Sequence, residues 1–177
     1  MNPSNNLFLV GMPGAGKSTI GRALSRRLGK NFHDTDAEIE TRTGVRIPVI
    51  FEIEGEPGFR RRECEVVARM TQLQNVVLAT GGGVVLDPAN RAALKARGFV
   101  LYLYAPPREL WRRTRHDKSR PLLQAEDQRA RMEELFQQRD PLYRETADLV
   151  AETGRQSVSA LVVELLPRIE KACALLA

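Results

Sequence analysis

Cysteine, histidine and long apolar runs are all scarce in this sequence. Only two cysteines and two histidines occur among its 177 residues. No C-x-x-C pair and no other Cys/His spacing typical of zinc sites is present, which argues against a structural zinc site. Cys64 and Cys173 lie far apart among apolar and helix-forming residues. We therefore expect both thiols to be at least partly buried, in keeping with a reducing compartment.

Apolar stretches long enough for a membrane span, about 20 residues, are absent from the sequence. The first apolar run, Leu7–Val10, is far too short for the apolar region of a signal peptide. We therefore expect a cytoplasmic protein with no membrane partner. With 42% hydrophobic and 28% charged residues the composition is ordinary for a globular chain, and we predict a single domain over residues 1–177.

The charge balance is basic. The chain has 27 lysines and arginines against 22 aspartates and glutamates, a formal net charge of +5. Such a surplus fits nucleic acid, an anionic membrane or small anionic substrates. Charge alone does not choose among these partners, so the position of the arginines along the chain has to decide.

Short apolar runs alternate with longer amphipathic segments. The apolar runs predict strands at residues 7–10, 31–34, 76–79, 99–103 and 147–151. The amphipathic segments predict helices at residues 17–28, 37–43, 59–74, 88–97 and 128–139, with two more beginning at 106–107 and at 157. Strands that alternate with helices predict a parallel sheet covered on both faces.

Four details of these elements rest on single residues. Asp36 stands where the N-cap of the 37–43 helix is expected. Leu73 belongs to the predicted apolar stripe of the 59–74 helix. The helix at 128–139 should stop before Pro141, and Pro167 should end or kink the terminal helix.

The segment Gly11-Met-Pro-Gly-Ala-Gly-Lys-Ser18 matches G-x-x-x-x-G-K-[ST], between a predicted strand and a predicted helix. Glycines allow positive φ and a close approach of the backbone to phosphates, and the exposed amides and the helix N-terminus attract anions. Lys17 would reach the β- and γ-phosphates of ATP, and the Ser18 hydroxyl would ligate Mg²⁺. The residues predicted to bind ATP in this loop are Gly14, Ala15, Gly16, Lys17, Ser18 and Thr19.

Two carboxylates, Asp34 and Asp36, follow the second predicted strand. Ligands collect beyond the carboxyl ends of parallel strands, and alternate residues of an extended chain face opposite ways. We therefore assign them different roles: Asp34 in a water-mediated contact with Mg²⁺, Asp36 in orienting or deprotonating an acceptor hydroxyl. The alternative for Asp36 is a plain helix cap.

Together these residues resemble the shikimate kinase family. The motifs that carry the resemblance stand in the family's order at Gly11–Thr19, Asp34–Asp36, Gly58–Glu63, Thr80–Gly83, Arg120–Leu123 and Arg139–Tyr143. The resemblance runs to about residue 145 and implies a three-layer α/β/α P-loop kinase fold. It also implies ATP-dependent phosphorylation of the 3-hydroxyl of shikimate, an acidic cyclic polyol.

The resemblance also implies roles in acceptor binding. Arg60 and Arg139 match the arginines that bind the shikimate carboxylate, which suits the planar fork of a guanidinium. Glu63, three residues after Arg60, matches the glutamate that holds them. Gly81, Gly82 and Gly83 match a segment that contacts shikimate. The aspartate that usually ends this strand in P-loop proteins is absent, which puts more weight on Asp34.

Arginines are dense from residue 108 to residue 120. By resemblance this stretch leads into a lid over ATP, which would exclude water from the transfer. Arg120 matches the arginine that contacts the transferring phosphate, Arg113 the one that packs on adenine, and Arg155 is assigned to the adenine side. Within the single domain we expect an acceptor-binding subdomain at about residues 35–62 and a lid at about residues 113–124.

Three other functions remain open from the sequence. The first is another small-molecule kinase, such as a gluconate or nucleotide kinase. The second is a basic P-loop protein that binds nucleic acid, although no aromatic stacking cluster or recognition helix accompanies the arginines. The third is a catalytically silent nucleotide sensor. The favoured hypothesis is a monomeric shikimate kinase with Mg²⁺ as cofactor, ATP and shikimate as substrates, and no nucleic-acid partner.

Overall fold

The computed structural model describes the backbone of residues 5–175 and the side chains of residues 5–172. Cys173 therefore lies outside the described side chains, whereas Cys64 is partly buried as predicted. In the described part of the chain, no helix is both long and apolar enough to cross a bilayer.

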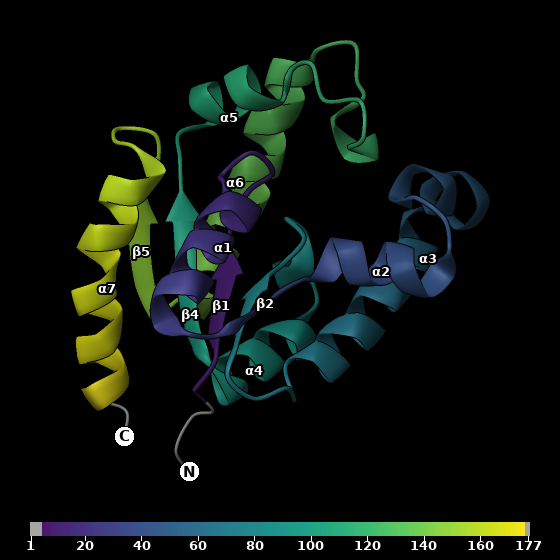
Figure 1. The fold of residues 1–177 in the computed structure, drawn as a ribbon. Helices are drawn as coiled ribbons and strands as arrows, with labels where there is room; N and C mark the ends of the chain where they lie inside the picture. The colour runs from purple at the N-terminus through teal and green to yellow at the C-terminus, as the bar shows by residue number, and fades with distance from the viewer. Residues whose placement is uncertain (1–4, 176–177) are drawn as a thin grey trace.

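A five-stranded parallel sheet forms the centre of the molecule (Figure 1). The strands are β1 (Leu7–Val10), β2 (Asn31–Asp34), β3 (Val76–Ala79), β4 (Phe99–Tyr104) and β5 (Leu149–Glu152). Their order in the sheet is β2-β3-β1-β4-β5, so β1 lies between β3 and β4. Because all neighbours run parallel, every strand ends at the same edge of the sheet, and loops from several strands meet there.

Helices form the two outer layers. They are α1 (Lys17–Leu28), α2 (Thr35–Thr43), α3 (Ile47–Met70), α4 (Pro88–Arg97), α5 (Pro107–Thr114), α6 (Gln128–Thr146) and α7 (Val158–Leu175). Helices α1 and α7 pack against each other in one layer, while α4 packs against α3 and α6 in the other (Figure 1). The three-layer α/β/α arrangement predicted from the sequence is confirmed.

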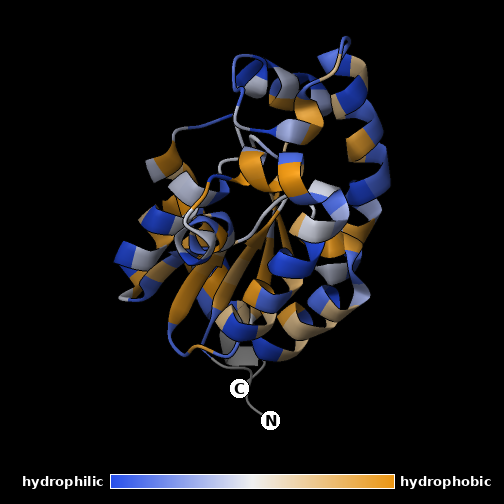
Figure 2. Ribbon diagram, turned by 90° about the vertical axis from the view of Figure 1, so that its right-hand side faces the viewer, coloured by the Kyte–Doolittle hydropathy of each residue, from blue (hydrophilic) through white to orange (hydrophobic). Residues whose placement is uncertain are grey.

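The core lies between the sheet and the two helical layers. Every residue of β1 and β3 is buried, as apolar runs in a parallel sheet predict. Figure 2 shows the apolar strands enclosed by helices whose outer faces are polar. The five strands stand where the sequence predicts them, except that β4 extends to Tyr104 and β5 spans Leu149–Glu152 and not residues 147–151.

The N-cap of α2 is Asp34, so the prediction that Asp36 caps this helix is wrong. The Oδ1 atom of Asp34 accepts the backbone N–H groups of Asp36 (3.0 Å) and Ala37 (3.3 Å). The helix thus begins at Thr35, and Asp36 falls in its first turn. Since capping needs only Asp34, the side chain of Asp36 is left for another role.

Three helices also differ in their bounds from the prediction. The helix predicted at 59–74 is part of α3, which runs from Ile47 to Met70 with non-helical backbone at Gly55 (φ 67°). Leu73 lies beyond its end and is 36% exposed. Helix α6 continues past Pro141 to Thr146. Helix α7 continues past Pro167, so this proline does not end the helix. A proline deletes one hydrogen bond, but in α6 the burial of apolar and polar side chains beyond it outweighs that loss.

Candidate active site

The phosphate loop joins β1 to α1 at the carboxyl edge of the sheet. Gly11, Gly14 and Gly16 have φ of 147°, 83° and 92°, a region that glycine reaches without strain. Lys17 is buried, and its Nζ donates to the carbonyls of Gly11 (2.7 Å) and Met12 (3.0 Å). Burial, with the positive charge of Arg120, lowers the pKa of Lys17 to about 7. An anion beside this ammonium would favour its charged form.

Ser18 and Asp34 form a pair of oxygen donors next to this loop. The Ser18 hydroxyl donates to Asp34 Oδ2 over 2.6 Å, while Asp34 Oδ1 caps α2. Hard oxygen donors of this kind, together with phosphate oxygens, are what Mg²⁺ prefers. Both line a cavity with Gly14, Gly16, Lys17 and Thr19. Ala15, the remaining residue predicted for ATP, is buried within the loop.

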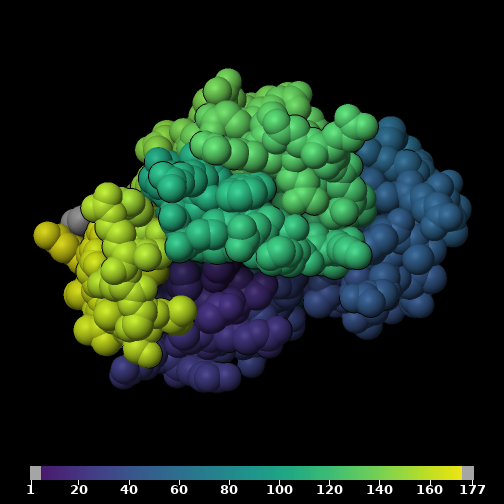
Figure 3. Space-filling model, turned by 90° about the horizontal axis from the view of Figure 1, so that it is seen from above, coloured from purple at the N-terminus to yellow at the C-terminus, as the bar shows by residue number. Residues whose placement is uncertain are grey.

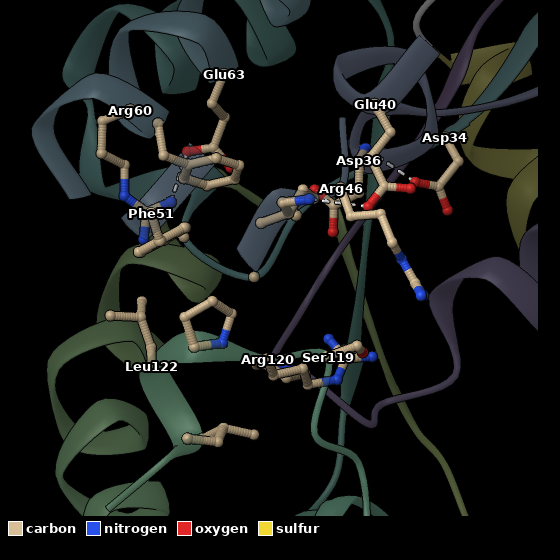
Figure 4. Close-up of a pocket in the computed structure, with 18 of the residues that line it drawn as sticks. Asp34, Asp36, Glu40, Arg46, Phe51, Arg60, Glu63, Ser119, Arg120 and Leu122 are labelled. Carbon is tan, nitrogen blue, oxygen red and sulfur yellow. Dashed lines mark hydrogen bonds and ion pairs between the residues drawn. The ribbon is translucent and has the colours of Figure 1, made fainter. Parts of the chain in front are cut away.

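A second cavity, of about 340 Å³, lies beside the first (Figure 4). Its polar lining includes Asp36, Arg60, Glu63 and Arg139 together with residues 81–83. Its apolar lining includes Ile47, Phe51, Phe59, Leu122, Leu123 and Leu135. The two cavities share Asp34, Asp36, Gly82 and Arg120. A molecule in the second cavity therefore lies next to the phosphate loop.

Arg60 and Arg139 reach the second cavity from different helices, α3 and α6. Arg60 pairs with Glu63 (2.7 Å) and with Glu56 (3.0 Å). Burial alone would lower the pKa of Arg60, but Glu63 and Glu56 raise it. Arg139 is 2% exposed, and burial lowers its pKa, with the charge of Arg60 adding to the effect. Two guanidinium groups whose charges act on each other in this way would be stabilised by an anionic ligand.

Three buried polar atoms in the described residues have no hydrogen-bond partner: Asp36 Oδ1, Glu63 Oε1 and Arg139 Nε. All three residues line the second cavity. Buried polar atoms in native proteins nearly always have partners, so this set indicates a ligand that carries both donors and acceptors. Burial, with the charges of Asp34 and Glu63, raises the pKa of Asp36 to about 6.

The glycines at residues 81–83 are packed too closely for side chains. A Cβ on Gly81 would lie 2.7 Å from Glu63 Oε1 and 2.8 Å from Asp36 Oδ1. A Cβ on Gly83 would lie 2.2 Å from Arg60 Nη1. A side chain at Gly81 or Gly83 would therefore have to displace the charged ends of Asp36, Glu63 or Arg60.

Arg120, in the predicted lid, lines both cavities and pairs with Asp117 over 2.8 Å. Arg113, on α5, donates to the Gly14 carbonyl (3.1 Å) and to Thr153 Oγ1 (3.2 Å), so it lies next to the phosphate loop. Arg155 does not join them: its side chain is 81% exposed and pairs with Glu152 (2.9 Å).

Sequence reasoning missed part of the site. Phe51 and Leu122 face each other across the second cavity (Figure 4). The spacing of apolar residues in the sequence does not distinguish these two from residues of the core. Tyr143 stands at the end of the Arg139–Tyr143 motif, but the sequence assigns it no role. Its hydroxyl donates to the Gly82 carbonyl, a contact that only the packing of α6 reveals.

Comparison with known proteins identifies the family of this site. The family model for shikimate kinase matches residues 13–170. The chain belongs to the shikimate kinase family. A shikimate kinase of Burkholderia lata is 60% identical over 171 residues, 97% of this chain and 93% of the relative. One of Nitrosococcus oceani is 58% identical, over 94% of this chain and 87% of the relative.

Solved structures agree with the family assignment. Shikimate kinase from Acinetobacter baumannii in complex with shikimate is 48% identical, with a TM-score of 0.91 over 94% of this chain and 93% of that chain. A gluconokinase from Sinorhizobium meliloti, at 14% identity and a TM-score of 0.59, shows the fold alone. As a member of the shikimate kinase family the chain is a phosphotransferase that acts on a hydroxyl of shikimate, with ATP as co-substrate.

Proposed function

We propose that the chain transfers the γ-phosphate of ATP in line to the 3-hydroxyl of shikimate held in the second cavity. The observation that carries this assignment to the site is the set of unpartnered atoms on Asp36, Glu63 and Arg139 beside Arg60. A carboxylate with neighbouring hydroxyls supplies the acceptors and donors that these atoms lack. The shikimate bound to the Acinetobacter baumannii relative supports the same occupant.

In this proposal Arg60 and Arg139 bind the carboxylate and Glu63 holds Arg60 in place. Gly81, Gly82 and Gly83 bring backbone close to the ring. Asp36 orients the acceptor hydroxyl and accepts its proton. Its elevated pKa brings it closer to working pH, where a general base is most effective.

On the nucleotide side, the backbone of residues 14–19 cradles the phosphates. Lys17 and Arg120 offset the negative charge that develops on the transferring group. Arg113 is placed to contact adenine from α5, and Arg155 would reach it only by leaving Glu152. Ser18, and Asp34 through a water, would hold Mg²⁺, which would neutralise charge on the β- and γ-phosphates.

The proposal extends to the organisation of the chain. Residues 35–62 form the acceptor-binding subdomain, which stands at one end of the molecule (Figure 3, blue), and residues 113–124 form the lid. The proposal also includes a monomer in the cytoplasm that has no nucleic-acid or membrane partner.

The test is ADP release by the purified protein with Mg²⁺ and ATP, in the presence and absence of shikimate. We expect strong stimulation by shikimate that is lost in Asp36→Asn and Arg60→Ala while ATP still binds. Arg61→Ala is the matched control, because Arg61 is the exposed neighbour on the same helix and does not line the cavity. Without stimulation the acceptor assignment is wrong, and gluconate and nucleoside monophosphates are the next acceptors to assay.

A further inference from the structure

Tyr143 is a fully buried residue whose hydroxyl lies where three parts of the site meet. Its ring, on α6, is 0% exposed. The hydroxyl donates a hydrogen bond to the Gly82 carbonyl and lies 3.7 Å from the sulfur of Met12 in the phosphate loop. Arg139 lies one helical turn earlier; burial raises the pKa of Tyr143, and the nearby positive charge of Arg139 opposes that rise. The Tyr143 hydroxyl thus joins α6 to the Gly82 carbonyl beside the Arg139 guanidinium.

Gly82 is the point at which the 81–83 segment touches the phosphate loop. A Cβ added to Gly82 would lie 2.8 Å from Cδ of Pro13, so the segment rests directly on that loop. On either side, Gly81 abuts the carboxylates of Asp36 and Glu63, and Gly83 abuts the Arg60 guanidinium. The position of this short backbone stretch therefore sets the distance between acceptor-binding groups and the phosphate loop.

Other contacts hold Gly81, the first residue of the segment. The Gly81 N–H donates to Thr35 Oγ1 (3.0 Å), and the Gly81 carbonyl accepts the Val84 N–H (3.2 Å). The Gly82 carbonyl is held by Tyr143. Because the peptide unit is planar and trans, the direction of this carbonyl also fixes the direction of the Gly83 N–H, which points the opposite way. Glycine backbone offers little resistance to rotation, so the Tyr143 hydroxyl determines which way this peptide faces.

We propose that Tyr143 is a positioning residue for phosphoryl transfer: its hydroxyl fixes the Gly82 peptide in the geometry that binds the acceptor. The inference rests on the proposed function and adds a residue to it. Tyr143 acts through Gly82 and is not a catalytic residue. Burial raises its pKa, so the phenol stays protonated and remains a donor at working pH.

A neighbouring tyrosine supplies a matched control. Tyr102 packs on Tyr143 with ring centroids 4.9 Å apart and is 1% exposed. Its hydroxyl donates to Asp140 Oδ1 (2.7 Å), and neither residue lines either cavity. Phenylalanine at either position keeps the ring and removes the hydroxyl with its hydrogen bonding, and only the hydroxyl of Tyr143 contacts Gly82.

The experiment compares kcat, KM for shikimate, KM for ATP and melting temperature of Tyr143→Phe and Tyr102→Phe. We expect kcat/KM for shikimate to fall about tenfold in Tyr143→Phe, with KM for ATP unchanged within about twofold. Tyr102→Phe should lower the melting temperature but leave all kinetic constants at wild-type values. If Tyr143→Phe changes only the melting temperature, or changes both KM values alike, the positioning role is wrong.

If Tyr143→Phe is too unstable for activity assays, its affinity for shikimate can be measured by calorimetric titration at low temperature. Weaker shikimate binding by the folded variant supports the proposal, and wild-type affinity overturns it. The wild-type enzyme separates this inference from the proposed function. Absence of shikimate-dependent turnover in wild type would defeat the function itself, whereas normal turnover in both wild type and Tyr143→Phe would defeat only the role of Tyr143.

Discussion

At the scale of single residues, Asp36 is proposed to take part in catalysis, yet burial of its carboxylate lowers the stability of the folded protein. Its Oδ1 atom is buried without a partner and lies close to Glu63. Burial, as the first cause, raises the pKa of Asp36 from its ordinary value of 3.8 to about 6 in the folded protein. The folded state therefore binds this proton more tightly than the unfolded chain, and the resulting stability is lost as pH rises from about 4 through about 6.

We predict that Asp36→Asn stabilises the free enzyme at neutral pH while abolishing turnover. The raised pKa corresponds to at most about 3 kcal/mol of destabilisation by the ionised carboxylate. The gain in melting temperature should be small near pH 4, grow as pH rises from about 4 to about 6, and level off at higher pH. Thermal unfolding of both proteins across this range measures it, and an equal loss of stability at every pH would contradict the prediction.

The hydrogen bonds of Asp34 show why the residue scale is hard to predict. Sequence position suggests that Asp36 caps α2, because it directly precedes the periodic part of the helix. In the structure Asp34 caps the helix with one oxygen and binds the Ser18 hydroxyl with the other. One carboxylate thus joins the helix to the phosphate loop, and no local sequence signal distinguishes that arrangement from a cap two residues later.

At the scale of elements, the 81–83 segment has the least freedom to accept change. Its glycines are close to ionisable side chains on both α2 and α3, and Gly82 packs against Pro13. The segment lies between the groups proposed to bind the acceptor and the phosphate loop. A side chain there changes the site before it changes the core.

We predict that Gly81→Ala raises KM for shikimate about tenfold or more, because its Cβ would displace the Glu63 and Asp36 carboxylates. KM for ATP should change little. Gly29→Ala is the control: nothing lies within 4 Å of its Cβ, although its φ of 64° disfavours alanine. That control should lose about 1 kcal/mol of stability and keep wild-type kinetics. Similar kinetics for the two variants would count against the close packing at Gly81.

The helices show where prediction by element succeeds and where it fails. The phosphate loop, the flanking β1 and α1 and the other strands follow from local pattern, because apolar runs and glycine spacing are visible in the sequence. The passage of α6 through Pro141 is not visible locally. It depends on the burial of Tyr143 against Tyr102 and of Thr146 beyond the proline, which are contacts with distant segments.

At the scale of the whole molecule, part of the basic surplus is concentrated where two anionic substrates would bind. Lys17, Arg60, Arg120 and Arg139 all line the two adjoining cavities. Motifs and resemblance name these four residues from the sequence. The apolar wall of the acceptor cavity could not be separated from the core in the same way, because burial in a cavity and burial in a core leave the same pattern of apolar residues.

We predict that the enzyme works as a single chain, since the residues that line the two cavities include a candidate for each role in the proposed transfer. Specific activity should not change with protein concentration, and sedimentation should give the mass of one chain with and without substrates. A rise in specific activity on concentration, together with a larger sedimenting species, would show that a second copy contributes to the site.

The unpartnered atoms of the acceptor cavity bear on discrimination among small acids. A compound with the same carboxylate but without the ring hydroxyls could still pair with Arg60 and Arg139. It would leave Asp36 Oδ1 and Glu63 Oε1 buried without hydrogen-bond partners. An apolar pocket imposes no such free-energy penalty on binding. Analogues of shikimate that lack ring hydroxyls should therefore bind more weakly, because they leave these buried oxygens without hydrogen-bond partners.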